Sequence, residues 1–474
     1  MRNLPACLIT LCCMALAGCA QPARSPDLAR IYDRAAQSAG PERTPVIVLP
    51  GILGSKLEDA VDGQRVWGAF TFGAADADTA DGARKIALPM EEGKPLAEIR
   101  DSVIPTDVLD VVVADVAVFR NLEIGAYVDI LQTLAAGQYR DENLGESGAV
   151  NYGGLHYTCF QHAYDWRRDV AEAAADLALM VDGAQWLARD VRGLPEDAPV
   201  KVDVVAHSMG GLVLRYYLRY GAQPMPEDGS LPDLTWEGAA NVRRAVLVGT
   251  PSAGSILSLQ QLVDGWDLNP LFPNYRSSIL GTMPAIYQLL PRARHGFVRD
   301  AATNEPIDVF DIATWEKYEW GLADPDQDRI LEWLLPDAET AEERREIALD
   351  HLRKCLARAE QFHRALDVPA SPPPGTELSL FAGDAEPTPT TALVDADGKI
   401  RIVGEAPGDN TVTRQSALMD ERTDDNWTPG LVSPVAWDRV QFVFEDHLGL
   451  TRTPAFSDNL LYLLLEAPDP EGSE

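Results

Sequence analysis

The sequence predicts an α/β fold in which a mostly parallel sheet carries helices on both faces. Three observations lead to this expectation: short apolar runs recur along the chain, helical patterns separate them, and several runs end in glycine-bearing turns. Short continuous apolar runs are typical of parallel strands that are buried on both faces. Alternation of such strands with helices favours crossover connections, and these produce a parallel sheet.

Composition bounds the class of protein. The 474 residues suffice for one large domain with insertions or for two domains, and 46% hydrophobic residues can fill a substantial core. The chain holds 73 acidic against 40 basic residues, a formal net charge of -33. This charge balance argues against nucleic acid as a partner, and against binding to anionic lipid by charge alone.

The amino-terminal stretch has the pattern of a targeting segment. Arg2 precedes an apolar run over residues 4–16 that is too short to span a bilayer stably, and Leu-Ala-Gly-Cys follows at 16–19. This tetrapeptide resembles the lipobox of bacterial lipoproteins. The resemblance implies that residues 1–18 are a signal peptide and that Cys19 is acylated on its thiol and its new amino terminus. An ordinary signal peptide is the alternative.

A lipidated Cys19 would hold the protein on a membrane, because each buried methylene of an acyl chain contributes about 0.8 kcal/mol. Ala20 rather than Asp follows the cysteine, and in Gram-negative lipoproteins this implies delivery to the outer membrane. We therefore expect a membrane-anchored lipoprotein of the bacterial outer membrane that faces the periplasm or the cell exterior. Residues 19–44 supply the lipidated cysteine and a polar, proline-bearing tether.

Cysteine usage indicates neither a metal centre nor a disulfide framework. After loss of the signal peptide and acylation of Cys19, the remaining cysteines are Cys159 and Cys355. We expect both to be buried free thiols, although an export compartment permits a disulfide. The sequence has no CxxC pair and no cluster of His and Cys, so we expect no metal and no other cofactor.

The core is predicted to begin with a strand over 46–49, a short apolar run of the buried parallel type, which opens a first core segment at 45–255. The turn that follows reads Pro-Gly-Ile-Leu-Gly-Ser-Lys-Leu-Glu at 50–58. A glycine-bearing turn after the first core strand can aim a backbone N–H at developing negative charge, and that of Ile52 is our candidate oxyanion donor. The alternative is a plain glycine-rich strand exit.

Polar and apolar segments then alternate towards the centre of the chain. A polar, glycine-spotted stretch at about 61–105 has the character of a lid-like insertion. The segments after it are predicted, in order, as an apolar run (111–118), a helix (127–136), a strand (155–166) and a helix (170–191).

Residues 201–217 have the pattern of a buried strand that breaks into a small-residue turn at Ser208 and continues directly as a helix. Such a turn lifts the serine hydroxyl above the sheet edge, and the N–H groups at the helix start favour negative charge beside it. Ser208 is therefore the predicted nucleophile, and the N–H of Met209 the second oxyanion donor. Ala206 stands where glycine is usual. The alternative is a serine that only caps the helix.

After a further predicted strand at 242–248, the alternation stops. Residues 256–375 hold short apolar stretches and one long amphipathic helix over 340–366, which predicts a large helical cap insertion. The core resumes in 376–474, and its last two strands are predicted at 378–381 and 440–444. Apolar cap residues are candidates for an acyl-binding wall, with ordinary packing as the alternative: Leu262, Trp266, Leu268, Leu271, Phe272, Ile286, Leu289 and Leu290.

We call the strand, the turn at Ser208 and the helix the elbow. A serine nucleophile needs a base and an acid, and in folds with such an elbow they arrive in the chain order serine, acid, histidine. His447 follows the last predicted strand, where a loop can return to the carboxyl edge of the sheet, so it is the predicted base; a surface histidine is the alternative. Asp409 lies in a tight turn before that strand and is the predicted acid. The remaining downstream candidates are His295, His351 and His363 for the base and Asp384, Asp395 and Asp397 for the acid.

Four segments together resemble the lecithin:cholesterol acyltransferase family, which includes lysosomal phospholipase A2 and phospholipid:diacylglycerol acyltransferases. They are the turn at 50–58, Tyr-Asp-Trp-Arg at 164–167, Ala-His-Ser-Met-Gly-Gly at 206–211 and Gly-Asp-Asn-Thr-Val at 408–412. The resemblance implies an α/β-hydrolase fold with Ser208 as nucleophile, Asp409 as acid and His447 as base, in agreement with the chain order. Two features depart from the family: Asn410 stands where glycine is usual, and residues 58–100 lack the cysteines of the animal lid loop.

The sequence thus predicts a serine acyltransferase or lipase. Ser208 would attack an acyl ester of a glycerolipid or phospholipid, form an acyl-serine intermediate and pass the acyl group to water or to an alcohol. Trp166 is expected to pack at a strand end, and Arg167 to form an ion pair. Two other classes remain open: a carboxylesterase or thioesterase for small soluble substrates, and a non-catalytic lipid-binding lipoprotein.

Overall fold

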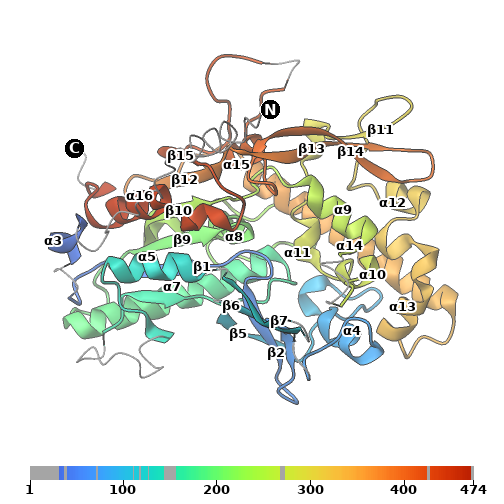
Figure 1. Ribbon diagram of the computed structural model, residues 1–474, viewed down its shortest axis with the longest axis horizontal. Coiled ribbons are helices and arrows are strands. Elements are labelled where there is room, and N and C mark those ends of the chain that lie inside the picture. The colour runs from blue at the N-terminus through green and yellow to red at the C-terminus, as the bar shows by residue number, and fades with distance from the viewer. Residues whose placement is uncertain are drawn as a thin grey trace, which may run out of the picture.

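The computed structural model describes residues 31–36, 40–70, 73–109, 111–116, 119–125, 127–143, 156–266, 273–423 and 427–470. Its centre is a sheet of six parallel strands in the order β15-β12-β10-β9-β1-β8 (Figure 1). Their bounds are β1 (Val46–Leu49), β8 (Cys159–Gln161), β9 (Val202–His207), β10 (Val242–Val248), β12 (Glu377–Gly383) and β15 (Arg439–Val443). The predicted parallel sheet is therefore confirmed.

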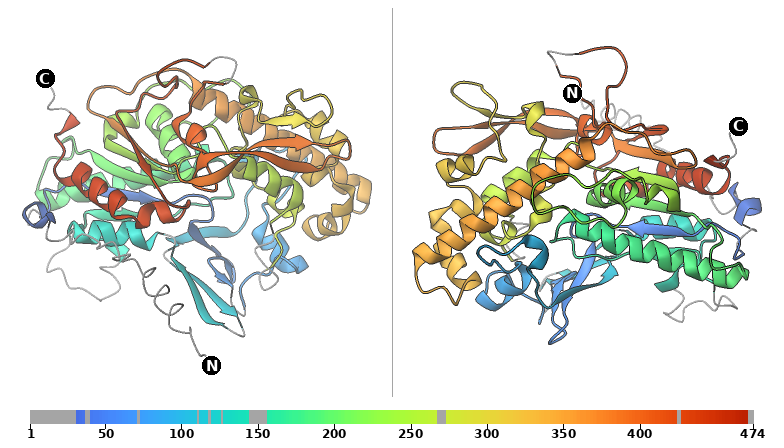
Figure 2. Two further views of the ribbon diagram at one scale, coloured as in Figure 1. Left: turned by 45° about the horizontal axis from the view of Figure 1, so that its top comes forward. Right: turned by 180° about the vertical axis from the view of Figure 1, so that it is seen from behind.

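Helices cover both faces of this sheet because its strands are apolar on both sides. Ile47 and Leu49 pack into one core with α7 (Val170–Arg192) and α8 (Met209–Tyr220), whereas Val46 and Val48 pack into a second core. The second core is completed by α5 (Val128–Ala136) and α16 (Pro454–Leu465). Figure 1 shows α5 and α16 on one face, and the right-hand view of Figure 2 shows α7 on the opposite one. The α/β-hydrolase fold is thus present.

The region after β10 forms the helical cap. Its helices are α9 (Ile256–Asp264), α10 (Ser277–Leu280), α11 (Pro284–Tyr287), α12 (Ile312–Tyr318), α13 (Asp328–Leu334) and α14 (Ala341–Asp367), with 3-10 turns η3 (Ala293–His295), η4 (Gly321–Ala323) and η5 (Pro325–Gln327). The long helix predicted over 340–366 is confirmed as α14, whose N-cap Thr340 accepts a hydrogen bond from Glu343 N. Such a cap satisfies one of the otherwise unpaired N–H groups at the helix start.

A hairpin of β13 (Glu386–Val394) and β14 (Ile400–Gly408) belongs to the cap side of the molecule, although it follows β12 in the chain. It forms a small sheet with β11 (Val298–Asp300), and Trp320 Nε1 donates to Gly398 O at 2.7 Å. The sequence predicts that 376–474 belongs to the core. In the structure β12 and β15 lie in the central sheet, whereas the hairpin extends over the cap.

The polar stretch at 61–105 is folded against the cap and the core. It contains strands and a helix, and several of its apolar residues, among them Trp67, Ile86 and Leu96, are buried, whereas Val61 and Ile104 are exposed. The elements of this region are β2 (Ser55–Asp59), β3 (Arg65–Trp67), β4 (Ala69–Phe70), α4 (Ala80–Ile86), η1 (Leu96–Glu98), β5 (Val103–Val108), β6 (Val111–Val116) and β7 (Phe119–Gly125). The stretch has a polar sequence because charged residues separate its buried apolar residues.

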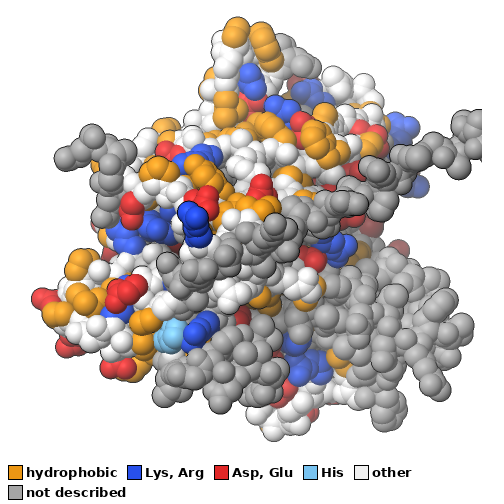
Figure 3. Space-filling view, turned by 60° about the vertical axis from the view of Figure 1, so that its left-hand side comes forward, with side chains coloured by type: hydrophobic (Ala, Val, Ile, Leu, Met, Phe, Trp, Pro, Cys, Tyr) orange, Lys and Arg blue, Asp and Glu red, His pale blue; other side chains and the backbone are white. Residues whose placement is uncertain are grey.

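The remaining short elements are α3 (Asp33–Ala36), η2 (Ala239–Asn241), α15 (Arg414–Leu418) and η6 (Gly449–Arg452). The strand predicted over 155–166 is shorter than expected, since only β8 is extended within 156–166, and a turn follows. Cys159 and Cys355 are both buried and free, as predicted. Acidic and basic side chains are interspersed over the face seen in Figure 3, as expected for a solvated surface.

Among the described residues, no helix is both long and apolar enough to span a membrane. Residues 1–18 and the predicted lipidation site Cys19 lie outside the described residues.

Candidate active site

Ser208 occupies the junction between β9 and α8, where the chain turns sharply. Its backbone has φ 54° and ψ -126°, a combination that costs a non-glycine residue on the order of 1–3 kcal/mol. The strand ends at His207 and the helix begins at Met209, so the turn consists of the serine alone. The serine is held in a strained conformation by two well-formed elements, which is the geometry predicted from the sequence.

The turn requires glycines because other backbone segments approach it closely. A Cβ added at Gly210 would lie 2.4 Å from Pro50 O and 2.8 Å from Leu49 O, and one added at Gly51 would lie 2.7 Å from Ser208 Cβ. These distances are shorter than van der Waals contact, so the backbone of the loop after β1 would have to move. The loop and the elbow therefore fit together only without side chains at these positions.

We expect Gly210→Ala to lower the free energy of unfolding by about 1–3 kcal/mol, since overpacking against backbone cannot be relieved by a rotamer change. The same exchange at Gly183, on the exposed side of α7 with nothing within 4 Å, should instead raise it by about 0.5–1 kcal/mol. Urea unfolding followed by circular dichroism measures both. Equal effects of the two exchanges would contradict the tight fit at the elbow.

Ala206, where glycine is usual, lies inside β9 and is fully buried. It pairs with Leu49 of β1 and with Leu247 of β10. In a strand interior a methyl group costs nothing conformationally, and alanine is preferred over glycine on entropic grounds. The departure from the usual motif is therefore accommodated.

The structure brings Ser208, His447 and Asp409 together. His447 Nε2 lies 2.9 Å from Ser208 Oγ, and His447 Nδ1 lies 2.8 Å from Asp409 Oδ2. Both distances are those of hydrogen bonds, and the order serine, histidine, carboxylate is that of a catalytic triad. Asp409 is fully buried and Ser208 is 7% exposed. The three residues are far apart in the sequence: Ser208 follows β9 and His447 follows β15 of the parallel sheet, whereas Asp409 follows β14 of the hairpin.

Asp409 is held by the turn that carries it. Its Oδ1 accepts hydrogen bonds from Thr411 N at 3.0 Å and Val412 N at 2.6 Å, which leaves Oδ2 for the histidine. Asn410, which stands where the family usually has glycine, has φ 72°. Asparagine tolerates this left-handed conformation better than most residues, so the substitution preserves the turn.

The other downstream candidates have different partners. His295 Nε2 lies 3.0 Å from Glu421 Oε2, and the hydrogen bonds of His351 and His363 go to backbone carbonyls within the cap. Asp384 forms an ion pair with Arg414, and the Asp395 carboxylate accepts from backbone N–H groups of its own turn. None of these contacts includes Ser208 or His447.

The loop after β1 is held by four aromatic side chains. Tyr164 Oη donates to Pro50 O at 2.9 Å, Trp67 Nε1 to Leu53 O at 2.8 Å and Trp166 Nε1 to Ser55 O at 3.2 Å. Tyr127 Oη accepts from Gly51 N at 2.7 Å. These bonds fix a loop in which Leu53 has φ 65°.

The two predicted oxyanion donors belong to the segments that meet at Ser208. Ile52 follows Gly51, which lies against Ser208, and Met209 is the first residue of α8. Sequence reasoning singled out Ile52 and Met209 but missed Tyr127 and Trp67, which lie in segments with no recognised motif.

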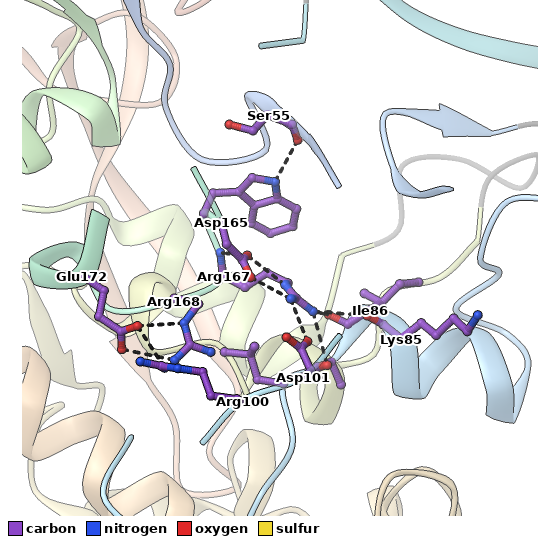
Figure 4. A network of polar contacts seen from close by, with 12 residues as sticks. Ser55, Lys85, Ile86, Arg100, Asp101, Asp165, Arg167, Arg168 and Glu172 are labelled. Carbon is purple, nitrogen blue, oxygen red and sulfur yellow. Dashed lines mark hydrogen bonds and ion pairs between the residues drawn. The ribbon is translucent and has the colours of Figure 1, made fainter. Parts of the chain in front are cut away.

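The motif at 164–167 connects this loop to the stretch at 61–105 (Figure 4). Trp166 contacts the loop, and the Arg167 guanidinium forms ion pairs with Asp165 at 2.7 Å and Asp101 at 2.8 Å. Arg167 also donates to the carbonyls of Lys85, Ile86 and Ala87 and is fully buried. The packing and ion pair predicted for this motif are observed.

We expect Arg167→Met to lower the free energy of unfolding by about 3–5 kcal/mol, because it leaves buried carboxylates without a partner. Arg100→Met is the matched control, since the Arg100 side chain is 58% exposed and pairs with Glu172 at 3.1 Å; its cost should stay below about 1 kcal/mol. Chemical denaturation measures both. A similar small loss for the two variants would show that the buried network contributes little.

The described residues of the predicted acyl-binding wall differ in their burial. Leu262, Ile286, Leu289 and Leu290 are buried in the main hydrophobic core, so these residues pack the cap. Trp266 is half-buried and lies beside Trp67 and Tyr275, with ring centroids 6.3 and 5.9 Å away. Leu268, Leu271 and Phe272 lie outside the described residues. Within the described part of the chain, no cluster of His, Cys, Asp and Glu could hold a metal ion.

Comparisons with known proteins bear on the family and the fold. Residues 143–334 match the family model described as lecithin:cholesterol acyltransferase. This range contains two of the four motifs that carry the resemblance, those at 164–167 and 206–211. No curated protein sequence matches the chain.

Among solved structures, a chain of the Tle4-Tli4 complex has a TM-score of 0.53 at 15% identity, covering 89% of this chain and 98% of that one. At this identity the likeness shows a shared fold. Bacillus licheniformis lipase BlEst2 in its mature form has a TM-score of 0.33 at 12% identity, covering 90% and 94% of the two chains. Lipase 1 from Pelosinus fermentans has a TM-score of 0.33 at 12% identity, covering 90% and 99%.

Proposed function

Starting from the lecithin:cholesterol acyltransferase match over residues 143–334, we propose that this protein is a serine-dependent lipid acyl hydrolase or O-acyltransferase. Its substrate is an acyl ester of a glycerolipid or phospholipid, and the reaction proceeds through an acyl-serine intermediate. The observation that carries the proposal is the position of His447, within hydrogen-bond distance of both Ser208 Oγ and Asp409 Oδ2.

In the acylation step, Ser208 Oγ attacks the ester carbonyl carbon while His447 Nε2 takes the hydroxyl proton. Asp409 accepts the Nδ1–H of His447, which keeps Nε2 free to act as the base and stabilises the imidazolium that forms. The tetrahedral intermediate then collapses: the bond to the leaving alcohol breaks, His447 returns the proton to that oxygen, and the acyl group remains on Ser208.

The backbone N–H groups of Ile52 and Met209 are proposed to stabilise the negative charge on the carbonyl oxygen. Two features support this assignment: Met209 N lies at the start of α8, where N–H groups favour negative charge, and the loop carrying Ile52 is fixed by hydrogen bonds to aromatic side chains. Donors that are already in place when charge develops lower the barrier most effectively.

The second half-reaction decides between hydrolysis and transfer. Water or an alcohol gives its proton to His447 and attacks the acyl-serine carbonyl, and Ser208 leaves with a proton from His447. Water yields a fatty acid, whereas an alcohol yields a new ester. The outcome depends on whether the capped site excludes water while the alcohol is bound.

The experiment uses the purified protein with labelled phosphatidylcholine, with and without a long-chain alcohol. Release of labelled fatty acid identifies a hydrolase, and formation of a labelled ester in the presence of the alcohol identifies an acyltransferase. A soluble ester and a thioester serve as competing substrates. If they are turned over and phosphatidylcholine is not, a small-substrate esterase or thioesterase is the function. Absence of reaction with a fluorophosphonate probe would defeat the enzyme proposal and leave a lipid-binding lipoprotein.

We further propose that the protein is anchored to a membrane through acylated Cys19, in the bacterial outer membrane. The Leu-Ala-Gly-Cys stretch at 16–19 and the absence of Asp at position 20 support this. An anchor of several acyl chains would place the enzyme beside its lipid substrate. Mass spectrometry of the amino-terminal peptide tests the anchor: processing that continues in the presence of globomycin, with no diacylglyceryl group on Cys19, would contradict it.

A further inference from the structure

A chain of buried hydrogen bonds joins the loop after β1 to the backbone of the proposed catalytic histidine. Gly51 N donates to Tyr127 Oη at 2.7 Å, and Tyr127 Oη lies 3.2 Å from His207 Nδ1. On the other side of the ring, His207 Nε2 lies 3.0 Å from His447 O. The chain therefore runs from one proposed part of the site to another through the residue that precedes the nucleophile.

Only one arrangement of protons satisfies these contacts. Gly51 N–H can only donate, so Tyr127 Oη accepts from it and uses its own proton towards His207 Nδ1. A carbonyl oxygen can only accept, so His207 Nε2 carries the ring proton and donates it to His447 O. His207 is thus a neutral imidazole in the Nε2–H form, with both nitrogens in use.

The surroundings of His207 and Tyr127 keep both side chains uncharged. His207 is 2% exposed and Tyr127 is 3% exposed. Burial, together with the nearby His447, lowers the pKa of His207 to about 3, and burial raises the pKa of the Tyr127 hydroxyl. A buried polar group that loses its partner is costly, so the hydrogen bonds hold both ends of the chain firmly.

Both ends of the chain are loops that need support. Residues 444–446, just before His447, are exposed, and the Phe444 side chain is 70% exposed. The backbone of His447 gains an anchor to the buried end of β9 through His207. At the other end, Gly51 lies against Ser208, and its N–H donates to Tyr127 Oη. Tyr127 therefore holds the loop after β1 where it meets the serine.

We propose that His207 and Tyr127 are a positioning pair, in which a neutral His207 in its Nε2–H form sets the place of the His447 loop and, through Tyr127, that of the loop carrying Ile52. This inference rests on the proposed function, since it assigns the pair a role in the same acyl-transfer site. The ring of His207 lies beside that of His447, with centroids 4.8 Å apart, and its hydrogen bonds go to Tyr127 Oη and His447 O, so it acts through the position of the base.

The test measures the rate of Ser208 labelling by a fluorophosphonate probe, and kcat and KM for a lipid ester, in His207→Leu and Tyr127→Phe. A displacement of the base by about 1 Å lowers the rate on the order of a hundredfold. We therefore expect kcat in His207→Leu to fall on the order of tenfold to a hundredfold, Tyr127→Phe to fall less, and KM to change little in both.

Two further exchanges separate the halves of the chain. In His207→Gln the amide nitrogen can reach the place of Nε2 and donate to His447 O, whereas in His207→Asn the amide oxygen can take the place of Nδ1 and accept from Tyr127. If the contact with His447 is the one that matters most, Gln restores the labelling rate more fully than Asn. Nitrogen-15 spectra of the wild-type histidines should show a neutral Nε2–H form for His207 from pH 5 to 9.

His351 provides the matched control for loss of a buried histidine. It is 1% exposed and its Nε2 lies 3.0 Å from Thr282 O in the cap, so His351→Leu removes an equivalent hydrogen bond away from the triad. We expect it to lower stability without lowering the labelling rate of the folded protein. Equal labelling rates in His207→Leu and His351→Leu would overturn the positioning role alone. A wild-type protein that the probe does not label would overturn the proposed function, and this inference with it.

Discussion

Replacing Ser208 by alanine is expected to lower kcat for lipid ester cleavage by roughly a millionfold, the scale seen when a triad serine is removed. Without Oγ there is no atom to receive the acyl group, so the intermediate cannot form. Substrate affinity should change little, because the hydroxyl contributes to the reaction rather than to ground-state binding. Because Ser208 has φ 54°, a strain that alanine shares, the fold should be retained.

The measurement combines kcat with labelling by a fluorophosphonate probe, which needs the same oxygen. Ser278→Ala is the matched control, since Ser278 is fully buried in the cap and donates to Gln327 Oε1 at 3.1 Å. It should keep wild-type labelling within about twofold. If Ser208→Ala retained more than a tenth of the wild-type activity, another nucleophile would be responsible and the assignment of the triad would be wrong.

The elbow and the chain order of the triad residues could be predicted from the sequence because both depend on local patterns. A buried strand, a small-residue turn and a helix leave a continuous signal around Ser208. His447 follows from its place after the last predicted strand, because parallel strands bring their carboxyl ends to one edge, and Asp409 follows from a tight turn between the serine and that histidine. The structure brings all three side chains together, at distances that sequence alone does not provide.

The hairpin of β13 and β14 could not be predicted, because its strand signal is masked by Pro387 and Pro389. Proline removes a ladder donor and normally argues against a central strand. In the structure, β13 pairs with β11 only at Ala392, Leu393 and Val394. Among the described residues, the part of β13 that holds the two prolines therefore has only β14 as its partner in this sheet. On that side of β13 no further strand needs the missing N–H groups as hydrogen-bond donors.

Tyr127 and His207 escaped prediction for a different reason. Each is ordinary in its local segment, one at the start of an expected helix and one at the end of an expected strand. Their importance arises from a contact across 80 residues of sequence, Tyr127 Oη to His207 Nδ1 at 3.2 Å. Such side-chain contacts depend on rotamers and packing, for which a single sequence carries no periodic signal.

Asp409→Asn is expected to lower kcat by about ten-thousandfold while leaving the fold intact. The reason lies in how the turn uses the two carboxylate oxygens. Oδ1 accepts from Thr411 N and Val412 N, so asparagine must place its oxygen there and its NH₂ group towards His447 Nδ1. An NH₂ group can only donate, which forces the proton of His447 onto Nε2, and Nε2–H cannot accept the proton of Ser208.

Nitrogen-15 spectra of the histidines, together with kcat, test whether Asp409 sets the tautomer of His447. Nitrogen-15 spectra should show His447 as the Nδ1–H form in the wild type and the Nε2–H form in Asp409→Asn. Asp395→Asn is the matched control, because Asp395 Oδ1 also accepts two backbone N–H groups in a turn but belongs to the β13–β14 hairpin; it should keep full activity. An Asp409→Asn protein within tenfold of the wild type, or with the Nδ1–H form of His447, would show that this carboxylate does not set the tautomer of the base.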